Sequence, residues 1–229
     1  MRNTLIALFG GSGQRFGLPY PKQFALVDAR PLFVDVLDQY QNLNDINDIL
    51  VVSEPSTLDQ AKKLCDEYRL TKVIDVIPGG DTRQQSSYLG LKYLIDHNVD
   101  PATPVVIVDG DRPCVQKRYV TECLAMLAPN VGAVVAIPST DSLLLGESGL
   151  VKSYMPRKDA YRVQTPQAFL LADIYNAHKA SLTESFTDDA SIALKAGMDV
   201  HIVLGDETNI KITTPEDLEL YKQWKTKRA

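Results

Sequence analysis

The chain has 229 residues, of which 45% are hydrophobic and 23% are charged. This balance is typical of an ordinary globular protein and excludes a disordered, collagenous or coiled-coil chain. The formal charge of -5 provides no broad basic surface, so we expect neither nucleic acid nor a membrane surface as a partner. An anionic ligand would have to meet a local concentration of basic residues.

Short apolar runs rich in β-branched residues alternate along the chain with amphipathic stretches at helical spacing. The runs predict strands at residues 5–9, 49–52, 73–77, 105–108, 133–137 and 200–204. The amphipathic stretches predict helices at residues 31–41, 57–68, 83–95, 117–127, 172–180, 188–196 and 215–224, with Tyr88, Leu91 and Ile95 facing a sheet. This alternation predicts an α/β fold with a mostly parallel, doubly wound sheet, whose ligands bind beyond the carboxyl ends of the strands.

Residues 139–162 break the alternation, because they are polar and contain Gly146, Gly149 and Pro156. We expect this segment to leave the sheet as a β-arm. The chain shows no internal repeat or linker, which favours a single domain over residues 1–229 with the arm at about 139–162. No apolar run reaches the roughly 20 residues that span a bilayer, and the first one is too short for a signal peptide, so we expect a cytoplasmic protein.

The cysteines and histidines give no catalytic or metal-binding pattern. The three cysteines match no zinc or redox spacing and are expected to be small buried hydrophobes; they are Cys65, Cys114 and Cys123. The three histidines are scattered, without the clustering of a metal site or a triad; they are His97, His178 and His201.

The strongest functional motif is the glycine loop at residues 10–13 (GGSG), directly after the first predicted strand. Glycines at this place let backbone amides approach a phosphate, and Arg15 and Lys22 add positive charge nearby. A P-loop does not fit, because Gly17 is followed by leucine rather than lysine. A dinucleotide fingerprint does not fit either, because Phe16 stands at its third glycine. The motif therefore indicates a nucleoside triphosphate.

The second motif is the sequence DGDRP at residues 109–113, at the end of the predicted strand 105–108. Mg²⁺ is usually held by one or two carboxylates together with substrate phosphates and water, and the strand end places Asp109 where the phosphates should lie. Asp111 could be a second ligand or a partner of Arg112. Alternatively, these acids only cap the next element.

With these motifs the chain resembles the cytidylyltransferases that load polyol phosphates onto CMP, chiefly the methylerythritol phosphate and ribitol phosphate enzymes. The resemblance covers essentially the whole chain. In the family's order it also includes residues 79–83 (GGDTR) with Ser86, 164–169 (QTPQAF), 187–191 (TDDAS) and 209–218 (NIKITTPEDL). It implies a nucleotidyltransferase-type, Rossmann-like fold, dependence on Mg²⁺, and a homodimer whose β-arms embrace the neighbouring subunit.

The resemblance also implies roles for individual residues. The nucleotide would be bound by Gly10, Gly11, Gly13, Gln14, Gly80, Asp81, Ser86 and Arg112. The catalytic residues around the phosphates would be Arg15, Lys22 and Lys211, with Asp109 as the metal ligand. The acceptor phosphate would be held by Arg157, Thr165 and Thr187, with Arg157 reaching from the partner's arm.

The chemistry of the implied reaction agrees with this set of residues. A phosphate oxygen of the acceptor attacks the α-phosphorus of CTP, and CMP is transferred with release of pyrophosphate. A phosphate monoester has a second pKa of about 6, so it is ionised near neutral pH and no general base is required. Catalysis then depends on positioning and fixed positive charge, which explains why no histidine or cysteine site is needed.

Several residues depart from the family's pattern. The family usually has His-Asp-Ala-Ala-Arg where residues 108–112 read VDGDR, so Val108 replaces the histidine and Asp111 is an additional acid. Residues 79–84 and 187–191 look like the methylerythritol phosphate branch. Residues 10–13, 22–24 and Tyr161 look more like the ribitol phosphate branch. We favour methylerythritol 4-phosphate as the acceptor and keep ribitol 5-phosphate as the alternative.

Two alternatives belong to other classes of protein. One is a non-catalytic nucleotide-binding module. The other is a nicotinamide oxidoreductase, since Tyr88 and Lys92 have the Tyr-x-x-x-Lys spacing of a short-chain reductase, although the usual upstream serine is missing. Asp188 and Asp189 are a possible acid/base pair, but one of them is equally suited to cap the following helix.

Overall fold

The computed structural model describes residues 2–10, 16 and 20–228. The strands of the main sheet are β1 (Thr4–Phe9), β4 (Asp48–Ser53), β5 (Val73–Pro78), β6 (Pro104–Asp109), β7 (Val131–Pro138), β10 (Tyr161–Leu170) and β11 (Asp199–Leu204). Two small hairpins are formed by β2 (Leu26–Val27) with β3 (Arg30–Pro31) and by β8 (Leu144–Glu147) with β9 (Leu150–Tyr154). The helices are α1 (Leu32–Gln41), α2 (Leu58–Glu67), α3 (Arg83–Asp96), α4 (Lys117–Ala125), α5 (Leu171–Ala180), α6 (Asp189–Lys195) and α7 (Pro215–Arg228).

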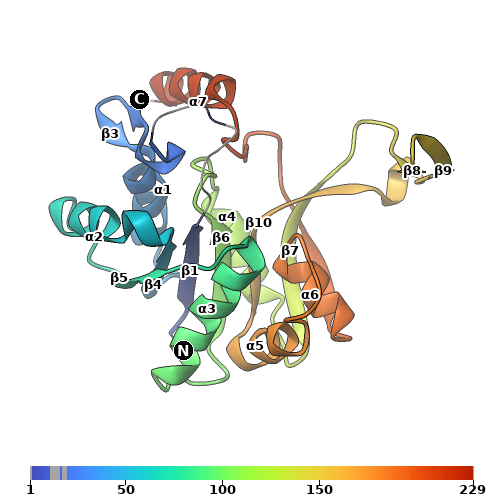
Figure 1. The fold of residues 1–229 in the computed structure, drawn as a ribbon, viewed down its shortest axis with the longest axis horizontal. Helices are drawn as coiled ribbons and strands as arrows, with labels where there is room; N and C mark the ends of the chain where they lie inside the picture. The colour runs from blue at the N-terminus through green and yellow to red at the C-terminus, as the bar shows by residue number, and fades with distance from the viewer. Residues whose placement is uncertain (1, 11–15, 17–19, 229) are drawn as a thin grey trace.

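Within the described residues the main sheet has seven strands in the order β11-β7-β10-β6-β1-β4-β5 (Figure 1). Neighbouring strands are parallel except around β10, which runs antiparallel to both β6 and β7. The mostly parallel sheet, its six predicted strands and the seven predicted helices are confirmed. The sequence did not predict β10, because its middle is the polar stretch at residues 164–167, where a bulge shifts the register between Val163 and Gln167.

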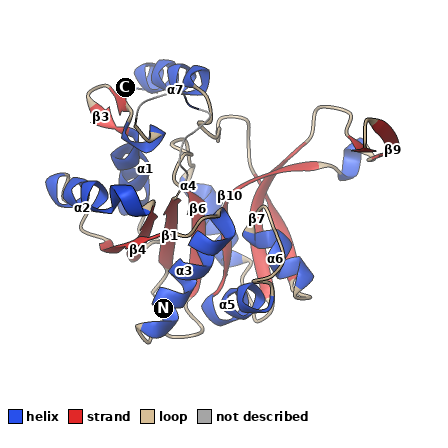
Figure 2. Ribbon diagram, viewed as in Figure 1, coloured by secondary structure: helices blue, strands red, loops and turns tan. Residues whose placement is uncertain are grey.

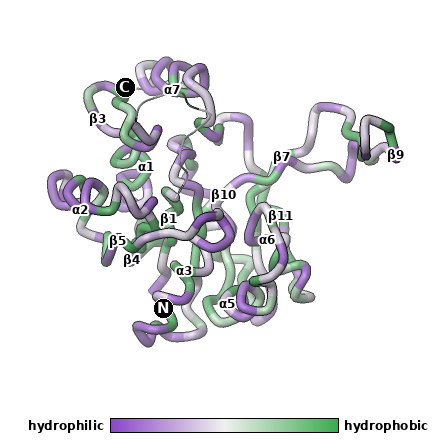
Figure 3. Tube along the Cα trace, in the orientation of Figure 1, coloured by the Kyte–Doolittle hydropathy of each residue, from purple (hydrophilic) through white to green (hydrophobic). Residues whose placement is uncertain are grey.

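Both faces of the sheet are covered by helices (Figure 2). Successive residues of a strand point to opposite faces, so Leu5 and Ala7 pack in one core and Ile6 and Leu8 in another. The first core contains apolar residues of α1, α2, α4 and α7, and the second contains those of α3, α5 and α6. The hydrophobic colouring accordingly concentrates on the strands in the middle of the molecule (Figure 3). The doubly wound arrangement predicted from the sequence is confirmed.

One predicted contact of α3 is wrong. Leu91 is fully buried and Ile95 packs against the same core, as expected. Tyr88, however, stacks on Tyr175 of α5, with the ring centroids 5.8 Å apart, instead of facing the sheet. The flank of α3 meets a neighbouring helix, and the periodicity of one helix cannot distinguish a helix from a sheet as the packing partner. All three cysteines are buried, as predicted.

The strand order reverses at β1, which lies between β4 and β6. From β1 the chain proceeds outward through β4 to β5, and α3 then returns it to β6 on the other side of β1. The carboxyl ends of β1 and β6 therefore lie side by side, where the amide of Gly110 donates to the carbonyl of Leu8 at 2.8 Å. A reversal of this kind is where open α/β sheets bind their ligands.

The segment between β7 and β10 leaves the sheet as the predicted arm, with the β8–β9 hairpin at its far end (Figure 1). The amide of Ser139 donates to the carbonyl of Ala160 at 2.8 Å and closes the base of the arm. Its apolar side chains are largely exposed, with Leu150 and Tyr154 each at 69%. The division into domains and the dimerisation role of the arm stay predictions. None of the helices in the described part of the chain combines the length and apolar character needed to cross a membrane.

Helix α7 is fastened to α1 by one buried carboxylate. Asp35 accepts hydrogen bonds from Lys225 Nζ at 2.6 Å and from Tyr221 Oη at 3.2 Å, and Arg30 Nε lies 3.6 Å away. Burial, together with the charge of Asp35, raises the pKa of the Tyr221 phenol above its usual range. The phenol therefore remains a hydrogen-bond donor, and α7 is held by a charged and a neutral contact.

We expect Asp35→Ala to lower the free energy of unfolding by about 2 kcal/mol, because it leaves Lys225 and Tyr221 without their shared acceptor. The partial exposure of Lys225 keeps the loss below that of a fully buried pair. Asp38→Ala is the matched control, since Asp38 is half-exposed and pairs with Arg30 at 3.2 Å; we expect it to lose less than about 1 kcal/mol. Urea unfolding at pH 7 measures both, and equal losses would contradict the assigned role of Asp35.

Candidate active site

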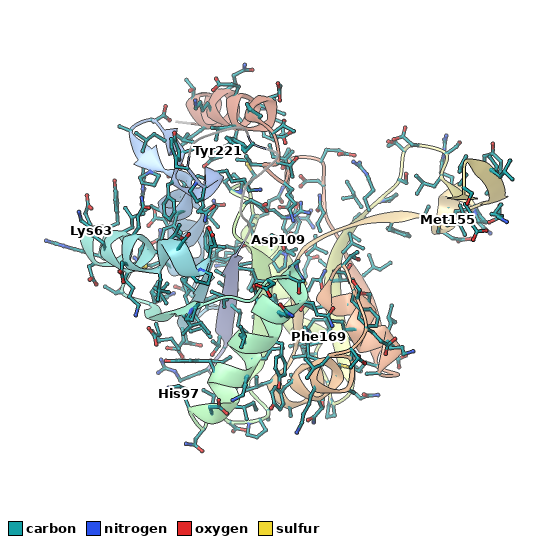
Figure 4. All side chains as sticks on the ribbon, in the orientation of Figure 1. Lys63, His97, Asp109, Met155, Phe169 and Tyr221 are labelled. Atoms are coloured by element: carbon teal, nitrogen blue, oxygen red, sulfur yellow. The ribbon has the colours of Figure 1, made fainter. Side chains whose placement is uncertain are left out.

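Two adjoining cavities lie beyond the carboxyl ends of β1 and β6. The larger cavity has a volume of about 630 Å³, and the predicted residues lining it are Gly10, Gly80, Asp81, Ser86, Asp109 and Lys211. The smaller cavity has a volume of about 290 Å³, and the predicted residues lining it are Asp109, Arg112, Thr165, Thr187 and Lys211. Figure 4 shows Asp109 near the middle of the molecule, above the end of α3. The structure thus brings together residues from six separate segments of the chain.

Part of the wall of the larger cavity is formed by Gly10 and Gly80, which lie against the first turn of α3. Ser86 Oγ accepts from the amide of Gly80 at 3.2 Å and donates to the carbonyl of Thr82 at 3.0 Å. A Cβ atom on Gly10 would lie 2.9 Å from Ser86 Oγ, so a side chain at this position would displace the Ser86 hydroxyl from its place. Thr82 and Gln85 form a capping box at the start of the helix. These hydrogen bonds hold the backbone from Gly80 to Thr82 at the edge of the larger cavity.

Asp109 is the electrostatic centre of the site. Arg83 Nε donates to its Oδ1 at 3.0 Å, Lys211 Nζ donates to its Oδ2 at 3.0 Å, and Arg112 Nε lies 3.5 Å from Oδ2. Burial alone would raise the pKa of Asp109, but the charges of Arg83, Lys211 and Arg112 outweigh it and hold the pKa well below its usual value. Asp109 is therefore an ionised carboxylate surrounded by fixed cations.

Asp111, the additional acid, pairs with Lys22 rather than with Arg112. Lys22 Nζ donates to Asp111 Oδ2 and to the carbonyl of Ile212, both at 2.6 Å. Arg112 is buried and does not pair with Asp111. Its Nη1 donates instead to the carbonyl of Asn209 at 2.7 Å. The predicted catalytic lysine is thus paired with an acid of the same chain, and it is not among the described residues that line either cavity.

The two predicted threonines and the two acids that follow Thr187 lie in different surroundings. Thr165 Oγ1 accepts from the amide of Asp109 at 3.1 Å, which fixes the bulge of β10 against the end of β6. Thr187 is exposed at the rim of the smaller cavity. Asp188 accepts from the amide of Ser191 at 2.7 Å and caps α6, so the capping interpretation is confirmed for this residue. Asp189, in contrast, is completely buried.

The sequence missed the cluster that surrounds Asp189. Its Oδ2 accepts from Arg83 Nη1 at 2.8 Å, and its Oδ1 accepts from Ser87 Oγ at 2.5 Å and meets His178 Nε2 at 2.9 Å. Burial alone would raise the pKa of Asp189. The charge of Arg83 and the hydrogen bonds from His178 and Ser87 outweigh this effect, so the pKa lies below its usual value. The one sequence signal was that His178 falls on the apolar face of α5, with Leu171 and Ile174.

Some predicted site residues are not placed at the cavities. Gly11, Gly13, Gln14 and Arg15 lie outside the described residues. Arg157 is exposed in the arm and is not among the described residues that line either cavity. The acceptor-binding role of Arg157, reaching from the partner's arm, stays a prediction.

Asp109 and Asp111 form a donor set that fits a hard divalent cation. Both line the larger cavity, and Asp111 Oδ1 is buried without a hydrogen-bond partner among the described residues. No group of three or more potential metal-binding side chains occurs in the described part of the chain. Two carboxylates completed by substrate phosphates and water are, however, the arrangement that Mg²⁺ commonly uses.

Comparison with known proteins identifies relatives over nearly the whole chain. A model of the 2-C-methyl-D-erythritol 4-phosphate cytidylyltransferase family matches residues 4–224. The chain is 37% identical over 219 residues to the enzyme of that name from Thermosipho melanesiensis, covering 95% of each chain. It is 34% identical to the one from Geotalea uraniireducens, covering 96% of this chain and 95% of the other. A solved 4-diphosphocytidyl-2C-methyl-D-erythritol synthase from Anaerococcus prevotii superimposes with a TM-score of 0.82 at 27% identity, covering 98% of this chain and 96% of that one.

The lowered pKa values of Asp109 and Asp189 predict how stability depends on pH. Between the folded and unfolded pKa values the unfolded chain binds more protons, so stability is complete above about pH 5 and falls on acidification. Each carboxylate contributes a slope of at most about 1.4 kcal/mol per pH unit. We expect Asp189→Asn to give a shallower loss of stability between pH 5 and 3 in urea unfolding. If the wild-type protein and Asp189→Asn lose stability with the same slope against pH, the pKa of Asp189 is not lowered in the folded protein.

Proposed function

The chain belongs to the 2-C-methyl-D-erythritol 4-phosphate cytidylyltransferase family, and we propose that the two cavities around Asp109 are its active site. The reaction is the transfer of CMP from CTP to 2-C-methyl-D-erythritol 4-phosphate with release of pyrophosphate, a step of isoprenoid precursor synthesis. The observation that supports this site most strongly is that Asp109 and Lys211 line both cavities. A donor in one cavity and an acceptor in the other would meet at this shared wall.

The larger cavity receives CTP. Gly10, Gly80 and Ser86 present closely packed backbone to the cytidine part, with Asp81 beside them. Lys22 and Lys211 supply positive charge to the phosphates, and the family resemblance adds Arg15 and the remainder of the glycine loop. Because backbone groups and short side chains have fixed positions, they can select the small pyrimidine base without rearrangement.

The smaller cavity receives the polyol phosphate. Thr165 and Thr187 offer hydroxyl groups. Arg112, which the family resemblance assigned to the nucleotide, lines this cavity instead of the larger one and offers a cation here. Val163 is the one apolar side chain among the described residues that line this cavity. An apolar contact of this kind suits the methyl branch of methylerythritol phosphate, whereas ribitol phosphate has no methyl group to place there.

The transfer requires no general base. The acceptor phosphate is already ionised, one of its oxygens forms the new bond to the α-phosphorus, and pyrophosphate leaves with the electron pair of the broken bond. Lys22 exchanges Asp111 for a phosphate oxygen, and Lys211 stabilises the charge that grows on the α-phosphate. Asp109 and Asp111 would hold Mg²⁺, which would neutralise charge on the triphosphate.

The active protein is a homodimer in this proposal. Arg157 lies in an arm that extends away from the cavities of its own chain, with exposed apolar residues around it (Figure 4, where Met155 marks the arm). Exposed apolar side chains on a projecting hairpin are suited to a second copy of the chain, whose smaller cavity Arg157 would then reach. The cytoplasmic location and the absence of nucleic acid and membrane as partners stay predictions.

A panel of nucleotides and acceptors tests the function. We expect pyrophosphate release with CTP but not with ATP, GTP or UTP. We also expect kcat/KM for methylerythritol 4-phosphate to be at least about tenfold above that for ribitol 5-phosphate, because one methyl group in an apolar contact changes kcat/KM by about this factor. A preference for ribitol 5-phosphate would reassign the acceptor. Binding of CTP without turnover of any polyol phosphate would favour a nucleotide-binding module, and binding of NADPH without CTP would favour an oxidoreductase.

Mixed dimers test whether Arg157 acts across the interface. Lys22→Ala and Arg157→Ala should each abolish most turnover when present in both chains. Chains of the two variants, unfolded together and refolded at equal ratio, should recover about a quarter of the wild-type activity, because one site in half of the dimers regains both residues. No recovery in dimers confirmed by mass spectrometry would place Arg157 in its own chain's site.

A further inference from the structure

Arg83 occupies a special position among the residues of the site. Of the described residues, three line both cavities, and they are Arg83, Asp109 and Lys211. The family resemblance assigned roles to the last two and none to Arg83. A side chain on the wall shared by the two cavities lies where the α-phosphate of the donor and the phosphate of the acceptor must approach each other.

The guanidinium of Arg83 is fixed on two sides. Its Nε donates to Asp109 Oδ1 at 3.0 Å and its Nη1 donates to Asp189 Oδ2 at 2.8 Å. Two carboxylates from different elements thus hold one rigid, planar group, which has few other orientations open to it. A group fixed in this way loses little freedom when it binds a further anion.

The third nitrogen of Arg83 is unused. Nη2 is buried and has no hydrogen-bond partner among the described residues. A guanidinium carries five N–H donors, and a buried donor without an acceptor is unfavourable by about 1–3 kcal/mol. The other two nitrogens of this group are paired, so Nη2 is the one that lacks an acceptor in a residue that lines both cavities. A phosphate oxygen bound against Arg83 would supply that acceptor.

Asp189 has a buried support of its own. Ser87 and His178 both contact Oδ1, which leaves Oδ2 for Arg83. Asp189 and His178 are each completely inaccessible to solvent. This group of Ser87, His178 and Asp189, which we call the Asp189 support, lies behind Arg83 and does not line either cavity among the described residues.

The local charges also favour an anion beside Arg83. Asp109 already has Lys211 and Arg112 close by, so it does not require Arg83 for charge compensation. Among the described residues, the ion-pair network around Asp109 joins the four cations Lys22, Arg83, Arg112 and Lys211 to the three acids Asp109, Asp111 and Asp189. This network has one cation more than it has acids. The other described acids that line the two cavities are Glu54, Asp81 and Asp188.

We propose that Arg83 is a catalytic residue whose Nη2 donates to a non-bridging oxygen of the α-phosphate as the acceptor attacks, and that the Asp189 support positions it. This proposal rests on the proposed function. The bond formed joins an acceptor phosphate oxygen to the α-phosphorus, the bond broken releases pyrophosphate, and Arg83 neither gains nor loses a proton. Its contribution is fixed charge where negative charge increases during the transfer.

Substitution of Arg83 separates chemistry from binding. We expect Arg83→Gln to lower kcat by about 10²-fold or more while the Kd for CTP, measured by calorimetry, changes less than about threefold. Arg83→Lys keeps one charge but cannot span both carboxylates and reach the phosphate, so we expect most of the same loss. Arg118→Gln is the matched control, because Arg118 pairs with Glu122 and Asp206 away from both cavities.

Chemical rescue distinguishes a catalytic Arg83 from a merely structural one. Added guanidinium ion at millimolar concentration should restore turnover of Arg83→Ala by about tenfold or more, whereas ammonium at the same ionic strength should not. A kcat within about threefold of the wild-type value in Arg83→Gln would overturn the proposal. So would a loss of CTP binding that accounts for the entire loss of turnover.

A double-substitution cycle tests the Asp189 support. If Asp189 acts through Arg83, Asp189→Asn should lower kcat, and the double variant with Arg83→Gln should be no slower than Arg83→Gln alone. If the double variant instead lowers kcat by the product of the two separate factors, Asp189 does not act through Arg83 and the positioning role is contradicted. Ser87→Ala, which removes one neutral hydrogen bond, gives the same comparison should Asp189→Asn fail to fold.

Turnover by the wild-type protein tells the two proposals apart. If the wild-type protein releases no pyrophosphate from CTP with any polyol phosphate, the proposed function fails. If the wild-type protein turns over and Arg83→Gln keeps its kcat, as Arg118→Gln should, the proposed function stands and the contact of Arg83 with the α-phosphate is overturned.

Discussion

A single buried carboxylate, that of Asp109, determines how the site is assembled. Transfer of an ionised carboxylate from water into the interior is unfavourable by several kcal/mol unless cations and hydrogen bonds replace its hydration. Asp109 obtains this compensation from the start of α3, from the residue three positions later, and from the segment before α7. Segments far apart in the chain are therefore drawn to one point by the requirements of one charge.

The fold could largely be predicted because hydrophobic patterning is a local property. Six strands and seven helices follow from runs and periodicities within a dozen residues. The exception, β10, is instructive, because its polar residues Gln164, Thr165 and Gln167 are buried by long-range contacts that satisfy them individually, such as the hydrogen bond from the amide of Asp109 to Thr165. A strand that is stabilised by specific polar pairing leaves no alternation to detect.

The candidate site was predictable to the extent that strand ends and glycine turns mark it. Gly10 and Asp109 follow from this logic, and the family resemblance adds Lys211, Thr165 and Thr187. The roles of Arg83, Ser87 and His178 depend on how α3 packs against α5 and the start of α6, which no local pattern encodes. The sequence also left the partner of Asp111 undetermined. Arg112 is its neighbour in the chain, but the directions of the side chains in the structure make Lys22 its partner and leave Arg112 bonded to Asn209.

The same network explains how a chain with a net charge of -5 can present a site for phosphates. Four cations held closely around one point would repel one another, and the three acids offset most of this repulsion while no ligand is present. Asp111 has this effect on Lys22, at a position where the family usually has no acid. When a phosphate replaces Asp111 as the partner of Lys22, one anion is exchanged for another. The ammonium group of Lys22, which is largely buried, therefore always has an anionic partner. The site can therefore bind small anions in the absence of a basic molecular surface, because Arg83, Arg112 and Lys211 hold their positive charges at the walls of the two cavities.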